Sequence, residues 1–123
     1  MNARLLDAMG APEQLDVDPA VLAGWLAEGR ELELIDVREP YEREAGHIAG
    51  SRHIELLHLS EQASTVERGQ PVVFYCRVGA RSELAAQAFR TAGYEAYSMA
   101  GGLVRWAQEG LPLAPAGGHV AKH

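Results

Sequence analysis

Blocks of apolar residues recur along the chain at two spacings, which predicts strands alternating with helices. The clearest strand is the unbroken apolar run at residues 72–75, because such runs are typical of parallel strands buried on both faces. Weaker patterns predict strands at residues 14–17, 31–36, 52–54 and 96–99. Helical spacing predicts helices at residues 19–29, 40–45, 56–68 and 82–92, and a last one after residue 102. This order predicts an α/β domain: a mostly parallel central sheet of about five strands with helices on both faces.

Length and composition indicate one folded domain. The chain has 123 residues, 47% of them hydrophobic and 23% charged, which is typical of a globular protein that can bury its own core. We assign the domain to residues 14–112, after an N-terminal extension at residues 1–13. From residue 113 the chain is rich in proline, alanine and glycine, which predicts a flexible C-terminal tail at residues 113–123.

Charge and cysteine usage exclude several classes of function. The formal net charge of −6 argues against nucleic acid or an anionic membrane as the partner, because no basic excess is present to displace counterions. No segment has the apolar length of a membrane span or of a secretory signal. The single cysteine, Cys76, cannot form an internal disulfide or, alone, a Cys-rich metal site. These features predict a protein of the reducing cytoplasm.

Cys76 ends the most apolar predicted strand, at the sheet edge where parallel α/β proteins bind ligands. Two arginines, Arg77 and Arg81, follow within five residues, and Gly79 allows the backbone to curl so that N–H groups point inward. Ser82 is the predicted N-cap of the next helix, whose N-terminus adds partial positive charge. These features favour a thiolate over a thiol and form a cradle for a small anion. An isolated cysteine here would otherwise be read as a small core residue.

Four segments in order resemble the signature motifs of the rhodanese-type sulfurtransferases, over roughly residues 15–112. The cysteine loop is similar to the Cys-Arg-x-Gly-x-Arg-Ser loop of that family. The other three segments are Leu34-Ile35-Asp36-Val37-Arg38-Glu39-Pro40-x-Glu42, Gly46-His47-Ile48-x-Gly50-Ser51-x-His53-Ile54 and Gly101-Gly102-x-x-x-Trp106-x-x-x-Gly110-Leu111-Pro112. Each motif alone is weak evidence, whereas four in the family's order are strong evidence.

The resemblance implies a single rhodanese-like domain that transfers sulfur in two steps. Cys76 is the expected catalytic residue: its thiolate takes the outer sulfur of thiosulfate or a similar donor as a persulfide, and cyanide, a dithiol or a protein thiol then removes it. No cofactor is expected. The residues expected to bind the substrate are Arg77, Val78, Gly79, Ala80, Arg81 and Ser82.

Two alternatives share this fold. The chain could act as a persulfide carrier in a protein sulfur relay. Phosphatases and arsenate reductases are the other alternative, but their loop places arginine six positions after the cysteine, whereas Arg81 lies five positions after Cys76. A shorter loop forms a smaller ring of N–H groups, with less room to surround a tetrahedral phosphorus, so sulfur transfer is favoured.

Three further residues are expected to be structural neighbours of the site. Asp36 is expected to tie loops together, with Arg38 as a partner, and His47 to be a satisfied turn histidine. Arg38 and Glu42, four residues apart, are expected to form an ordinary ion pair. No metal site is predicted, since the histidine spacings match no zinc motif, and His119 with His123 would at most bind metal adventitiously.

Overall fold

A computed structural model of the protein describes residues 14–123 and has a five-stranded parallel sheet at its centre. The predicted extension at residues 1–13 lies outside the described residues. The strand order is β1-β5-β4-β2-β3, so β4, the strand that leads into Cys76, is in the middle. Every strand pair is parallel. The strands are β1 (Asp16–Val17), β2 (Glu33–Asp36), β3 (Arg52–His53), β4 (Val72–Tyr75) and β5 (Ala96–Met99). The predicted fold class is therefore confirmed.

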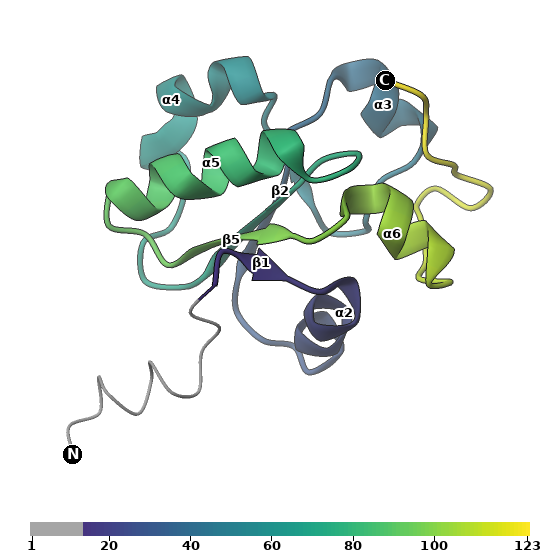
Figure 1. Cartoon of the computed structure of the whole chain (residues 1–123), viewed down its shortest axis with the longest axis horizontal. Coiled ribbons are helices and arrows are strands. Elements are labelled where there is room, and N and C mark those ends of the chain that lie inside the picture. The colour runs from purple at the N-terminus through teal and green to yellow at the C-terminus, as the bar shows by residue number, and fades with distance from the viewer. Residues whose placement is uncertain (1–13) are drawn as a thin grey trace.

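Helices cover both faces of the sheet (Figure 1). On one face lie α4 (Leu59–Gln62) and α5 (Ala80–Thr91), and on the other α2 (Pro19–Ala27) and α6 (Gly102–Gln108). Side chains of β4 alternate between the two cores: Phe74 packs edge-on against Phe89 with ring centroids 4.9 Å apart, while Val73 and Tyr75 join the opposite core. The central strand is thus held on both faces, as its unbroken apolar run predicts.

Two helix predictions are corrected by the structure. The predicted helix 56–68 is three short pieces: the 3₁₀ turn Leu56–His58, α4, and the 3₁₀ turn Ala63–Thr65. The Thr65 hydroxyl donates to the Gln62 carbonyl at 2.7 Å, a local bond that competes with regular helix. In addition, α5 begins at Ala80 with Gly79 as its N-cap, so the prediction that Ser82 caps this helix is wrong.

The segment after α6 returns along the sheet's ligand-binding end beside α3 (Pro40–Ala45) (Figure 1). The indole N–H of Trp106 donates to the Pro112 carbonyl at 2.8 Å, and His47 and Ala114 exchange two backbone hydrogen bonds of 2.9 and 2.8 Å. These bonds attach the start of the C-terminal segment to the rest of the domain. The predicted flexibility of residues 113–123 stays a prediction. Within residues 14–123, no helix is both long enough and apolar enough to cross a membrane.

Candidate active site

The sulfur of Cys76 lies at the carboxyl end of β4, inside the curl of the loop that follows. The Gly79 N–H donates to Sγ at 3.1 Å and the Ser82 N–H at 3.4 Å. Cys76 has no exposed surface and belongs to the core cluster under α5. Two amides and the N-terminus of α5 therefore point toward one buried sulfur atom, an arrangement that stabilises negative charge on it.

The loop takes this shape because glycines stand where a side chain would strain the backbone or collide with it. Gly79 has φ of +111°, a left-handed conformation that L side chains rarely adopt, and it turns the chain from β4 into α5. Across from it, a Cβ on Gly102 would collide with the Arg77 carbonyl. This close approach lets the amides of Leu103 and Val104 bond to the Cys76 and Arg77 carbonyls, at 2.8 and 3.0 Å. The first turn of α6 thus supports the loop through these two backbone hydrogen bonds.

A short chain of buried hydroxyl groups ends at the cysteine. The Ser82 hydroxyl lies 3.5 Å from the Cys76 sulfur, 3.1 Å from the Gly79 carbonyl, to which it donates, and 2.7 Å from the Ser98 hydroxyl. Ser98, on β5, is fully buried and was missed by the sequence analysis. Its signal was a polar residue within the otherwise apolar strand 96–99, since a buried hydroxyl needs a partner.

Arg81 is paired with a carboxylate on α3. Its two terminal nitrogens donate to the two Glu42 oxygens at 2.7 and 3.0 Å, and the Glu42 side chain has no exposed surface. The hydrogen bonds to Glu42 raise the pKa of Arg81. Burial alone would raise the pKa of Glu42, but the bonds from Arg81 and from the Glu39 amide lower it overall. The expected Arg38–Glu42 ion pair is therefore wrong, because Glu42 faces the loop instead.

Asp36 and Arg38 form a buried pair with each other. Arg38 donates from Nε and Nη2 to the Asp36 carboxylate at 2.8 and 2.7 Å, and from Nη2 to the Gly46 carbonyl at 2.8 Å. Burial would lower the pKa of Arg38, but the bonded carboxylate of Asp36 raises it overall. Burial, with the charge of Asp36, raises the pKa of Tyr75 to about 12, and its hydroxyl bonds to Asp36 at 3.2 Å. This network ties β2 to β4 below the site.

The side chains of the remaining predicted residues face solvent or bond to other parts of the chain. Val78 is 54% exposed, and Ala80 is the exposed first residue of α5. The Arg77 guanidinium points to the C-terminal segment, where Nε donates to the Ala121 carbonyl at 3.1 Å. His47 is bonded through Nδ1 to the Arg43 carbonyl at 3.1 Å, within the turn after α3.

A cavity of about 290 Å³ opens at the carboxyl ends of three neighbouring strands. Its walls come from the segment after β2, the segment after β3, the first turn of α5 and the C-terminal segment; they are lined by Val37, Glu39, Glu55, Leu56, Leu57, Arg81 and His123. Parallel sheets bind ligands at this end of their strands. His123 was not a predicted site residue, and no pattern in the sequence brings it here, because only the path of the chain after α6 does so.

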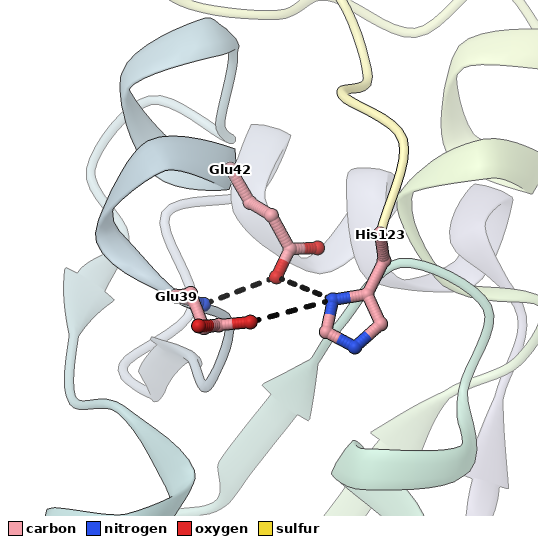
Figure 2. Close-up of side chains that lie close together, drawn as sticks. All are labelled: Glu39, Glu42 and His123. Atoms are coloured by element: carbon pink, nitrogen blue, oxygen red, sulfur yellow. Dashed lines mark hydrogen bonds and ion pairs between the residues drawn. The ribbon is translucent and has the colours of Figure 1, made fainter.

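Glu39, Glu42 and His123 place ligand-type atoms within 4.8 Å of one another, as a metal site would (Figure 2). The Glu42 oxygen that faces His123 Nδ1 at 3.2 Å already accepts from the Glu39 amide at 3.1 Å and from Arg81 at 2.7 Å. A guanidinium bonded to both oxygens of this carboxylate repels a metal cation. The donor set is better suited to hydrogen bonding and ion pairing than to a metal.

Comparisons with known proteins agree with this geometry. The rhodanese-like domain model matches residues 18–109. The chain is 37% identical to the probable adenylyltransferase/sulfurtransferase MoeZ of Mycobacterium tuberculosis over 109 residues, which is 86% of this chain but only 28% of that protein. It is 33% identical to the thiosulfate sulfurtransferase GlpE of Coxiella burnetii, over 69% of this chain and 81% of the relative.

A solved structure supports the same assignment. The rhodanese-related protein of Thermoplasma volcanium superposes with a TM-score of 0.76 at 29% identity, covering 82% of this chain and 98% of that one. The family model covers most of the described chain, and the cysteine loop, its bracing glycines and strands β2 to β5 fall within the matched residues, while β1 lies just before them. The chain belongs to the rhodanese-like domain family.

Proposed function

We propose that this protein transfers sulfane sulfur, from thiosulfate or a similar anionic donor, to a thiophilic acceptor through a persulfide on Cys76. The observation that carries the proposal is the pair of amides, of Gly79 and Ser82, aimed at Sγ from 3.1 and 3.4 Å. A sulfur that serves only as core packing needs no such donors. The names of sulfurtransferase relatives support the same reaction class.

The first step is a displacement at sulfur. The Cys76 thiolate attacks the outer sulfur of thiosulfate, a new S–S bond forms, and the old S–S bond breaks so that sulfite leaves with its electron pair. The product is Cys76–S–S⁻, and charge is conserved because thiosulfate and sulfite are both dianions. Backbone N–H groups of the cysteine loop then stabilise the terminal anionic sulfur by hydrogen bonds, as the amides of Gly79 and Ser82 do for Sγ.

The second step returns the enzyme to its starting state. A nucleophile such as cyanide attacks the outer sulfur, forms thiocyanate and leaves the Cys76 thiolate. A dithiol or a protein thiolate reacts in the same way and becomes a persulfide. Splitting the transfer allows donor and acceptor to use one site in turn. The proposed compartment is the reducing cytoplasm, where a lone thiol persists without a disulfide partner.

The loop's residues have different roles in this proposal. Arg81 shares its charge with Glu42, so it shapes the loop more than it attracts the donor. Arg77 is the candidate for anion contact, and the amides of Gly79 and Ser82 hold the sulfur. A phosphatase reaction is disfavoured, because Arg81 lies five rather than six positions after Cys76 and its guanidinium is already bound to a carboxylate.

Intact mass spectrometry after incubation with thiosulfate tests the proposal. We expect the wild-type chain to gain one sulfur atom that a reductant or cyanide removes. Cys76→Ser should gain none, and the assignment is unambiguous because Cys76 is the only cysteine. A wild-type chain that stays unmodified, with Cys76 confirmed as reduced, contradicts the proposal.

A second candidate is a persulfide carrier in a protein relay. The similarity to MoeZ favours it, because the name of that relative joins a sulfurtransferase to an adenylyltransferase and this chain spans 28% of its length. The same experiment separates the two candidates. Rapid mass gain followed by rapid loss to cyanide supports the enzyme, whereas a persulfide that cyanide removes slowly, but a partner thiol protein removes quickly, supports the carrier.

A further inference from the structure

Residues 118–123 return to the active site and lie over α3 (Figure 1). Their path is fitted to the backbone beneath: the His119 N–H donates to the Ala45 carbonyl at 2.8 Å. Gly46 makes this contact possible, because a Cβ there would lie 2.5 Å from the His119 carbonyl oxygen and 2.8 Å from its nitrogen. The segment therefore packs on α3 through its main chain, and the methyl group of an alanine at position 46 would displace it.

The end of the segment contacts the cysteine loop at Arg77 and α3 at Tyr41. The Ala121 carbonyl accepts from Arg77 Nε at 3.1 Å, and the Lys122 carbonyl accepts from the Tyr41 hydroxyl at 3.2 Å. His123 turns inward, with Nδ1 at 3.2 Å from one Glu42 oxygen and 3.6 Å from one Glu39 oxygen (Figure 2). Since Glu42 also binds Arg81, the segment is linked to both arginines of the loop.

His123 is part of the wall of the 290 Å³ cavity at the strand ends. The other walls are built by segments that the sheet itself positions, after β2, β3 and β4. His123 is the part of the wall that comes from the C-terminal segment, and its Nδ1 faces the carboxylates of Glu42 and Glu39 at 3.2 and 3.6 Å. A cavity of this volume is at the lower limit of those that take drug-sized molecules.

We propose that the C-terminal segment is a specificity-determining wall of the approach to the sulfur-transfer site, that is, of the cavity that reaches the cysteine loop at Arg81, with His123 as the residue that limits the size of the acceptor. This inference rests on the proposed function. With the wall in place, the site favours small anions such as thiosulfate and cyanide over a bulky thiol such as glutathione. Displacing the wall relieves this exclusion.

Acceptor competition at the preformed persulfide tests the wall. In both reactions the nucleophile bonds to the outer sulfur and the bond to Sγ breaks: cyanide yields thiocyanate, and the glutathione thiolate yields glutathione persulfide. The measured quantity is kcat/KM for glutathione divided by kcat/KM for cyanide. A merely structural defect lowers both values together and leaves this ratio unchanged, whereas the loss of a wall raises it.

Two variants remove the wall by independent routes. His123→Ala removes the side chain, and Gly46→Ala displaces the docked backbone. For both we expect the ratio to rise by about tenfold, the low end of what one side chain in a pocket wall contributes. His123→Gln retains a side chain of similar length that can bond to Glu42, so it should retain the wild-type ratio.

Gly24→Ala is the matched control for the glycine variant. A Cβ on Gly24 would meet nothing within 4 Å, and this residue lies in α2, outside the site. Its ratio should equal that of the wild type. An unchanged ratio in folded His123→Ala overturns the wall even if Gly46→Ala fails to fold. If the wild type forms no persulfide at all, the proposed function is wrong, and the proposed wall is wrong with it. If the variants turn over normally and the ratio is unchanged, the wall alone is wrong.

Discussion

Arg81 and Glu42 are joined by two hydrogen bonds, and the two residues differ in their access to water. The Glu42 side chain is fully buried, whereas the Arg81 side chain is 21% exposed. Removing one member of a buried ion pair leaves the other uncompensated, and the cost depends on whether the remaining charge can reach solvent. The two single substitutions should therefore have unequal effects on stability.

We expect Arg81→Ala to lower the free energy of unfolding by about 3 kcal/mol, because it leaves a buried carboxylate without its cation. Glu42→Gln should cost only about 1 kcal/mol, since the remaining Arg81 can turn toward water. Adding Glu42→Gln to Arg81→Ala should recover part of the loss. Urea denaturation of the four proteins measures these values, and equal costs for the two single variants would show that Glu42 is not buried in solution.

Residue-level patterns in the sequence correctly indicated the loop but not the partners of its side chains. The identities of Cys76, Gly79 and Arg81 are enough to predict a curled anion-binding loop after a strand. The Arg81–Glu42 pair is not predictable in this way, because the two residues are 39 positions apart and meet only once β2 and β4 pair in register. Spacing along a helix instead suggested Arg38 as the partner of Glu42, and the buried Asp36 binds that arginine.

At the scale of elements, periodicity predicted the strands well and the segment 56–68 poorly. The strands are specified by apolar runs and by the proline and glycine residues around them. In the segment 56–68, Leu59 and Val66 are buried but Leu57 is 83% exposed. The apolar residues are thus too few for a continuous buried face, and hydrogen bonds between neighbouring residues divide the segment into short turns.

The Arg81–Glu42 pair joins α3 to α5, so its ionisation affects the docking of two elements. The lowered pKa of Glu42 means that the folded state binds this proton less tightly than the unfolded chain, where the ordinary value is 4.5. The stabilisation is therefore fully present above that pH and is lost as the pH falls through the lower folded-state pKa.

We accordingly expect the stability difference between wild type and Glu42→Gln to be constant near neutral pH and to shrink in acid. At low pH the protonated Glu42 resembles glutamine, so the two proteins should converge. Urea denaturation between about pH 3 and pH 7 measures the difference directly. A difference that stays the same over this range would mean that the bonds from Arg81 do not depend on the charge of Glu42.

At the scale of the whole molecule, β4 connects stability to chemistry. Its side chains alternate between the two cores, and Cys76 continues the face that carries Phe74. The loop then closes against α6 on one side and begins α5 on the other. The sulfur is therefore positioned by elements from both faces of the sheet, which explains why a loop of only a few residues can hold a fixed shape.

The net charge of the molecule opposes its proposed anionic donor. The chain carries a formal charge of −6, the Arg81–Glu42 pair is neutral overall, and Glu39 and Glu55 also line the cavity. Thiosulfate, a dianion, must approach through this negative field, and dissolved salt screens the repulsion.

We expect kcat/KM for thiosulfate to rise as ionic strength increases from about 0.01 M to about 0.1 M, over which the Debye length falls from about 30 Å to about 10 Å. The persulfide's reaction with uncharged dithiothreitol should change much less over the same range. If kcat/KM for thiosulfate falls instead, the local positive charge of Arg77 and the loop amides outweighs the field of the whole molecule.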